Sequence, residues 1–192
     1  MTPVTRVGAE TIPVIKDLAE RTWKAADTSI ISPEQVKYML DLFYSEASLK
    51  KQMEDGHQFI VAKDHNKVIG VASYSVNPEP GLETAYSQSE GEEPGRSVEV
   101  FTNVYRLHKI YIDPGHQGKG LGKLLIGFII NDISSYDATH LEVNVNRYNK
   151  AVNFYQKIGF TITREEYINI GNGYFINDYV MNLTLQTYPY SS

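Results

Sequence analysis

The N-terminal half of the chain alternates between helical and strand-like spacing of its apolar residues. Residues 4–7 predict a short strand. Three helices are expected from start signals followed by apolar residues three and four positions apart, over 11–26, 33–44 and 46–54. Thr11 is the expected N-cap of the first, and the second opens on the capping box Ser32-Pro33-Glu34-Gln35. Apolar runs at 59–62 and 68–72 flank a short polar turn and predict a β-hairpin.

The C-terminal half carries a more regular pattern. Strand-like residues run from Val98 to Ile112, and helical spacing over 120–136 predicts an amphipathic helix. Apolar and polar residues alternate over 141–146, which predicts a half-buried strand. A short helix and two strands follow, with Gly171-Asn172-Gly173 favouring a tight turn between the strands. Because helices interrupt a run of strands, we expect one α/β (α+β) domain over residues 1–192.

Residues 77–97 interrupt that pattern. They hold three prolines, three glycines and five glutamates, and they show no apolar periodicity. We therefore expect a flexible insertion within the domain. Its glutamates could attract a cationic acceptor, although an acidic loop is usually only solvated.

Composition excludes several classes of function. The net charge of −5 argues against a surface for nucleic acid, and the absence of cysteine excludes disulfides, a thiolate nucleophile and a zinc–thiolate site. The longest apolar run, 124–130, is too short to span a bilayer, and the charged N-terminal residues do not fit a signal peptide. We expect a soluble, cytoplasmic protein with no membrane or nucleic-acid partner.

The most informative segment is residues 117–123, Gln-Gly-Lys-Gly-Leu-Gly-Lys, between a predicted strand and a predicted helix. Glycines let a ligand approach the backbone, and the first amides of a helix lack internal partners, so the segment predicts a phosphate or pyrophosphate site. An ordinary glycine-rich turn would show the same residues. A P-loop fits poorly because Gly120 follows Lys119, and a dinucleotide fold fits poorly because the segment lies past mid-chain.

Three short motifs occupy residues 107–160 in a fixed order. They are the strand 107–112, the Gln-x-x-Gly-x-Gly turn at 117–122, and an Asn…Ala…Phe-Tyr-x-Lys-x-Gly-Phe segment that ends at Phe160. With these motifs the sequence resembles the GNAT superfamily of acetyl-CoA-dependent N-acetyltransferases. The resemblance implies a mixed, mostly antiparallel sheet flanked by helices, with a splayed strand pair that holds the cofactor. It also implies acetyl transfer to a primary amine by direct attack.

The resemblance assigns the cosubstrate acetyl-CoA to two stretches of backbone. The backbone of Ile110 and Ile112 would pair with the pantetheine arm, and the amides of 117–122 would hold the pyrophosphate. The implied cofactor-binding residues are Ile110, Tyr111, Ile112, Gln117, Gly118, Lys119, Gly120, Leu121, Gly122, Lys123 and Asn149. Asn149 is also explained as a helix N-cap.

Tyr155 and Glu142 are the implied catalytic residues. Tyr155 would be the general acid that protonates the departing CoA sulfur, although composition alone favours a core aromatic there. Glu142 would be the base, because its side chain lies opposite the apolar face of its strand, which suits a cleft. A solvated strand carboxylate explains Glu142 equally well. In other family members the base lies where this chain has Arg106.

The sequence predicts no metal site, and it leaves the acceptor open. The five histidines show no ligand spacing, and we interpret His108 as a structural or solvated imidazole. The acidic composition favours a polyamine or another small cationic amine, with a protein N-terminus or lysine as the alternative. The 14 tyrosines could line an acceptor cleft or a homodimer surface.

Two readings other than an enzyme stay open at this point. A non-catalytic CoA-binding regulatory module would keep the fold but lack an acceptor site, and the absence of a glutamate at 106 is compatible with it. A phosphate-binding protein of another class would instead bind ATP in preference to CoA.

Overall fold

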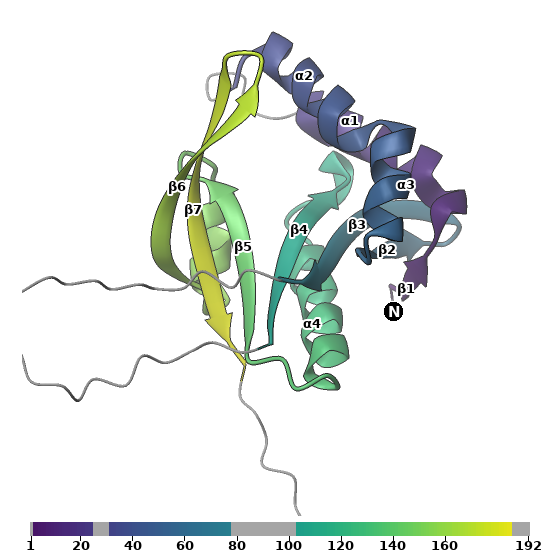
Figure 1. Cartoon of the computed structure of the whole chain (residues 1–192). Coiled ribbons are helices and arrows are strands. Elements are labelled where there is room, and N and C mark those ends of the chain that lie inside the picture. Colours follow the sequence, from purple (N-terminus) through teal and green to yellow (C-terminus); the bar gives the residue numbers. More distant parts are fainter. Residues whose placement is uncertain (1, 25–30, 78–102, 186–192) are drawn as a thin grey trace, which may run out of the picture.

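The computed structural model describes residues 2–24, 31–77 and 103–185. A seven-stranded sheet of order β1-β2-β3-β4-β5-β7-β6 forms its centre (Figure 1). All neighbouring strands in it are antiparallel except β4 and β5, which are parallel. The strands are β1 (Val4–Val7), β2 (Gln58–Asp64), β3 (Lys67–Val76), β4 (Val104–Ile112), β5 (His140–Asn146), β6 (Thr161–Gly171) and β7 (Tyr174–Thr184).

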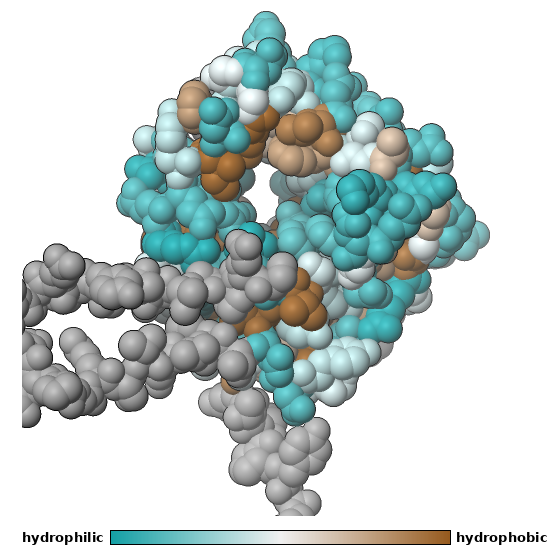
Figure 2. All heavy atoms as spheres, viewed as in Figure 1, coloured by the Kyte–Doolittle hydropathy of each residue, from teal (hydrophilic) through white to brown (hydrophobic). Residues whose placement is uncertain are grey.

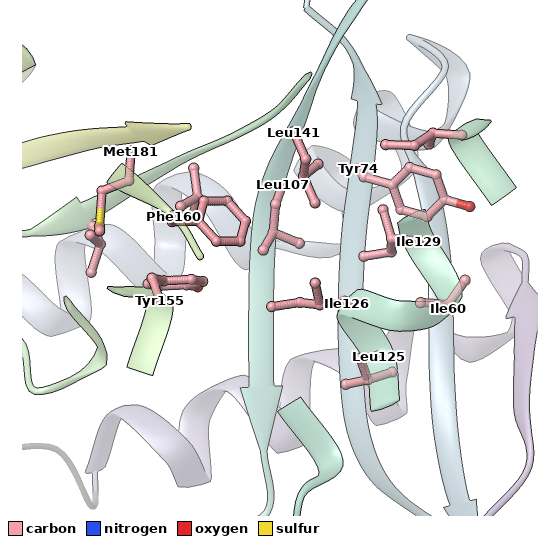
Figure 3. Packing of buried hydrophobic residues seen from close by; sticks show 14 of the residues in the cluster. Ile60, Tyr74, Leu107, Leu125, Ile126, Ile129, Leu141, Tyr155, Phe160 and Met181 are labelled. Atoms are coloured by element: carbon pink, nitrogen blue, oxygen red, sulfur yellow. The ribbon is translucent and has the colours of Figure 1, made fainter. Parts of the chain in front are cut away.

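Helices cover both faces of the sheet. Apolar residues of α1 (Ile12–Lys24) and α3 (Glu46–Glu54) form one core cluster with one side of β2 and β3, and α2 (Pro33–Tyr44) contributes Tyr44 to it. Residues of α4 (Leu121–Ser134) and α5 (Ala151–Lys157) form the other cluster, which Figure 3 shows in part. Successive strand residues point to opposite faces, so one sheet supplies both clusters. The expected mixed, mostly antiparallel sheet flanked by helices is confirmed.

Local signals account for most element boundaries. The hydroxyl of Ser32 accepts a hydrogen bond from the Gln35 amide at 3.2 Å, as a capping box requires. Asn172 and Gly173 have φ of 53° and 77°, as a tight hairpin turn needs. Thr11 is not an N-cap, because it belongs to a 3₁₀ turn, Ala9–Thr11, that continues directly into α1.

Two sequence predictions fall wholly or partly outside the described residues. The insertion predicted at 77–97 lies there except for Asn77, and so do residues 98–102 of the predicted long strand, of which β4 is the described part. That residues 1–192 form one domain stays a prediction. Within the described ranges, no helix combines the length and the hydropathy that crossing a bilayer requires.

The strands β4 and β5 separate halfway along their length. They pair from Val104 with His140 to Leu107 with Val143, and no pairing continues beyond that point. The register between β3 and β4 shifts between Ser73 and Tyr74, which leaves His108 as an extra residue in β4. Such a bulge bends a strand and increases its twist, so β4 turns away from β5. The expected splayed strand pair is confirmed.

The alternation predicted for β5 is wrong in its first half. Leu141, Glu142 and Val143 are all buried, whereas a half-buried strand would expose Glu142. β5 lies between β4 and β7, with the apolar cluster of α4 and α5 on one face. On the other face of the sheet, charged side chains from neighbouring strands bury one another. The alternation of apolar and polar residues along one strand cannot predict such an arrangement.

Candidate active site

A cavity of about 1110 Å³ lies where β4 and β5 separate. Residues of both strands line it, together with residues of α1, α2 and α3 and of the β6–β7 hairpin. The hairpin tip contacts α2: the Tyr38 hydroxyl donates to the Ile170 carbonyl at 2.8 Å, and the Gln35 amide group donates to the Phe175 carbonyl at 3.1 Å. Figure 2 shows an opening through the molecule beside this contact. The hairpin therefore bridges over the cavity to the helical layer.

The glycine-rich turn follows β4 and is anchored to the helical layer. Asp113 accepts a hydrogen bond from the Gly115 amide at 3.1 Å and forms an ion pair with Arg21 of α1. The Arg21 guanidinium, with His116, lowers the pKa of the Asp113 carboxyl. A short 3₁₀ turn (Pro114–His116) then leads to Gln117, which lines the cavity. This anchoring fixes where the turn leaves the sheet.

The turn itself presents open backbone. Gly118 and Gly120 have φ of 74° and 81°, and a Cβ added at either position would have no atom within 4 Å. Gly120 is the N-cap of α4 and has no side chain to accept from the first helical amides. Open space and unpaired amides at the positive end of a helix suit an anionic phosphate, so these residues fit the pyrophosphate of CoA.

Gly122 differs from the other two glycines. A Cβ added at Gly122 would lie 2.9 Å from the Cζ atom of Phe154, on α5. The lack of a side chain at this position therefore lets α4 approach α5 closely. A side chain at Gly122 would first displace Phe154.

The remaining predicted cofactor residues divide between cavity wall and support. Ile110, Tyr111 and Asn149 line the cavity, whereas the side chain of Leu121 is buried in the core. The Asn149 side chain accepts from the Ala151 amide at 2.8 Å, but the N-cap of α5 is Lys150, so the interpretation of Asn149 as the N-cap is wrong by one residue. Contacts of these residues and of Ile112, Lys119 and Lys123 with a cofactor stay predictions.

Tyr155 lies at the junction of core and cavity. Its ring packs between Phe154 and Phe160, with ring centroids 5.3 Å away in both cases, and it is among the residues that line the cavity. Burial raises the pKa of its hydroxyl, which keeps the group protonated at neutral pH. The hydroxyl makes no hydrogen bond to any described residue. Tyr155 therefore combines a packing role with a proton available to the cavity.

Glu142 does not lie in a cleft and is not solvated. Its side chain is 2% exposed and is absent from the cavity wall. One carboxylate oxygen accepts from Arg106 of β4, with the Nε donor at 2.9 Å, and the other accepts from Arg164 of β6 at 3.1 Å. Asn77 donates to the first oxygen at 3.3 Å. The sequence-based interpretation as a cleft carboxylate is thus wrong in its geometry, and a role as base loses its support.

Several residues of the cavity wall were not predicted. His57 and His108 stack with ring centroids 4.0 Å apart, and burial lowers the pKa of His108 to about 3. Lys109 donates to the Gln52 side chain at 2.7 Å, and burial lowers its pKa to about 8. Asp178 of β7 also lines the cavity. These residues come from distant elements, so no local spacing could have grouped them.

The family profile described as "Acetyltransferase (GNAT) domain" matches residues 27–175, which contain the turn, Tyr155 and most of the residues that line the cavity. This chain belongs to the GNAT acetyltransferase family. The resemblance drawn from the three motifs is confirmed. Among the described residues of this GNAT chain, no cluster of three or more His, Asp or Glu side chains is arranged to hold a metal ion.

Relatives of this GNAT chain include two curated bacterial proteins. It is 31% identical over 91 residues to the L-amino acid N-acyltransferase MnaT of Escherichia coli. The aligned segment covers 47% of this chain and 51% of that protein. It is 39% identical over 70 residues to the peptidyl-lysine N-acetyltransferase YjaB of Salmonella typhimurium, which covers 35% and 45% respectively. The chain thus spans about half the length of the curated relatives it matches.

The fold is shared with solved GNAT structures over nearly their whole length. The PaiA N-acetyltransferase of Thermoplasma acidophilum in complex with coenzyme A superposes with a TM-score of 0.70 at 17% identity, covering 96% of this chain and 99% of that one. At this identity the similarity concerns the fold alone.

Proposed function

We propose that this chain transfers an acetyl group from acetyl-CoA to a primary amine by direct nucleophilic attack. One observation carries the proposal: Gln117 at the start of the glycine-rich turn, the splayed strands and the Tyr155 ring all border a single cavity. Family membership and the CoA complex of a structural neighbour support it. Direct attack needs no cysteine, and the chain has none.

The residues that would hold acetyl-CoA are the turn and the free edge of β4. The amides from Gly118 to Lys123 would hold the pyrophosphate, because Gly120 provides no side-chain cap of its own. The edge of β4 from His108 to Ile112 that faces β5 has no strand partner, so its backbone groups are available to an extended pantetheine arm. Acetyl-CoA supplies an activated thioester there.

Tyr155 is proposed as the general acid. Its hydroxyl makes no hydrogen bond within the described residues, and its raised pKa keeps it protonated at neutral pH. The proton would pass to the departing sulfur as negative charge develops there. A positioned proton donor of this kind contributes about 10²-fold or more to the rate.

For the acceptor we propose a small molecule, because the β6–β7 hairpin bridges the cavity to α2 and limits its width. The net charge of −5 favours a cationic amine such as a polyamine. Lys109, a largely buried cation without a carboxylate partner among the described residues, favours an acceptor that also carries an anionic group. The amino-acid acceptor in the name of one curated relative agrees with that second candidate. A protein N-terminus or lysine is the third.

Thiol release from acetyl-CoA, measured with spermidine, L-methionine, glycinamide and a lysine-containing peptide, tests the proposal. We expect release that depends on the amine, with one acceptor class preferred at least tenfold. CoA binding without release in the presence of any of these amines would instead favour a regulatory module. ATP displacing CoA would overturn the assignment of the turn.

A further inference from the structure

Asp178 is a buried carboxylate whose side chain has no partner among the described residues. The residue is 8% exposed, and its Oδ1 atom has no hydrogen-bond donor among the described residues. Within those residues no ion pair or hydrogen bond involves the Asp178 side chain. A buried carboxylate without donors is costly, so its retention in a cavity wall calls for a ligand that supplies the donor.

The surroundings of Asp178 explain its electrostatic state. Glu166 lies directly across from it on β6 and Asn146 directly across on β5, so the adjacent strands provide a like charge and a neutral amide. Lys109 and the lowered-pKa His57 and His108 line other parts of the same cavity. Burial, with the charge of Glu166, raises the pKa of Asp178 to about 6.

Asp178 and Tyr155 approach the cavity from opposite faces of the sheet. Tyr155 packs in the cluster that contains Val143, Val145 and Met181. Asp178 lies across from Asn146, and because side chains alternate along a strand, both point away from that cluster. An acid on one face and a base on the other are suitably placed for an amine that attacks on one side while sulfur leaves on the other.

The other ionisable groups near this face are less suited to accept a proton. Glu142 is held by two guanidinium groups, and Glu166 accepts hydrogen bonds from Arg164 at 2.8 Å and from Asn144 at 2.8 Å. His108, with a pKa of about 3, is too weak a base at neutral pH. Asp55, also in the cavity wall, is exposed and paired with Lys51 at 2.9 Å, so Asp178 is the buried acidic residue that remains for a cationic substrate.

We infer that Asp178 binds the ammonium group of the acceptor and takes the proton that the amine must lose before it attacks. The inference rests on the proposed acetyl transfer. In that reaction the amine nitrogen bonds to the acetyl carbon while the carbon–sulfur bond breaks and its electron pair stays on sulfur. The ammonium gives one proton to the Asp178 carboxylate before attack, and the sulfur receives a proton from Tyr155 as it leaves. The second proton, which the nitrogen loses on becoming an amide, restores the Tyr155 hydroxyl, and Asp178 then releases its proton to solvent.

The test compares Asp178→Asn with Glu165→Gln. Asn preserves the shape of Asp and removes its charge, whereas Glu165 is an exposed carboxylate on the same hairpin, paired with Arg147 at 2.6 Å. With the best amine of the panel at pH 7, Asp178→Asn should lower kcat/KM about 100-fold, and Glu165→Gln less than twofold. The Asp178→Asn deficit should shrink toward alkaline pH, where the free amine needs no base. An unchanged kcat/KM and pH profile in Asp178→Asn would overturn the inference.

A second measurement does not depend on turnover. The carboxyl carbon of Asp178 in the wild-type protein, followed by NMR, should titrate near pH 6, and saturating spermidine or glycinamide should lower that pKa, since a bound ammonium stabilises the carboxylate. An Asp178 pKa that neither amine moves would reject the ammonium site. Absence of thiol release with every amine would reject the proposed function instead, so the two failures are distinguishable.

Discussion

Two carboxylates on the same polar face of β5 and β7 differ in the hydrogen-bond donors that surround them. Glu142, where β4 and β5 still pair, accepts hydrogen bonds from Arg106, Arg164 and Asn77. Asp178, where the strands have separated, accepts none from the described residues. Both are buried. Burial alone therefore does not distinguish a structural carboxylate from one that is available to a substrate. The two are distinguished by the hydrogen-bond donors that contact each carboxylate.

The same distinction separates two glycines of the turn region. A side chain at Gly122 would meet Phe154, whereas one at Gly120 would meet no protein atom within 4 Å. Gly122 is thus explained by the packing of α4 on α5. At Gly120, as at Asp178, the described residues leave room for a ligand that they do not themselves supply.

The largest expected effect is on Glu142. Glu142→Gln leaves the half-buried guanidinium groups of Arg106 and Arg164 facing a neutral amide, and breaking a pair whose carboxylate is buried costs up to about 3–5 kcal/mol of unfolding free energy. Urea unfolding measures it. A loss below about 1 kcal/mol would show that Arg106 and Arg164 are satisfied by solvent, and the contrast with Asp178 would then fail.

A matched pair of substitutions sharpens the contrast between the glycines. Gly122→Val should lower the free energy of unfolding by about 1–3 kcal/mol through overpacking against Phe154, and the folded protein should still bind CoA. Gly120→Val should weaken CoA binding at least tenfold, with a stability loss of about 1–2 kcal/mol from its positive φ. Calorimetric titration of CoA, run beside thermal unfolding, separates the two. Equal CoA affinity in both folded variants would contradict the assignment of Gly120.

Asp178→Asn should change the free energy of unfolding less than Glu142→Gln does. The change should have the opposite sign, because removing the Asp178 charge stabilises the protein. The pKa of Asp178 is raised from 3.8 to about 6, so its contribution to stability is complete below about pH 4 and is lost as the pH rises through 6. Asp178→Asn should therefore match the wild type near pH 4 and exceed its unfolding free energy by about 1–3 kcal/mol at pH 8. Urea unfolding at the two pH values measures the difference. Destabilisation by Asp178→Asn at pH 8 would mean that the carboxylate has a structural partner.

Local chemistry made most of the fold predictable. The capping box at Ser32, the Asn172-Gly173 turn and the glycines between β4 and α4 act through neighbours in sequence, and each is found where the sequence predicts it. Tyr155 was reached through a family motif, because without that motif its position favours a core aromatic. These features need no knowledge of the tertiary structure.

The polar half of the site could not be predicted for the converse reason. The partners of Glu142 lie 36 and 22 residues away in the sequence, on β4 and β6, so alternation along β5 could not show that its side chain is paired rather than solvated. Asp178 stands out because its side chain has no hydrogen-bond donor among the described residues. That can be recognised only when the positions of its neighbours in the tertiary structure are known. The same holds for the stacking of His57 on His108.

The most direct test of acetyl transfer in this cavity is Tyr155→Phe. Phenylalanine keeps the ring between Phe154 and Phe160 and removes only the hydroxyl group, so folding and CoA affinity should stay close to those of the wild type. The rate of thiol release with saturating acetyl-CoA and the best amine should fall about 100-fold or more, and the deficit should shrink with a thioester whose thiol leaves readily unprotonated. An unchanged rate in the folded, CoA-binding variant would contradict the proposed acetyl transfer with Tyr155 as general acid. Tyr155 would then have a packing role only.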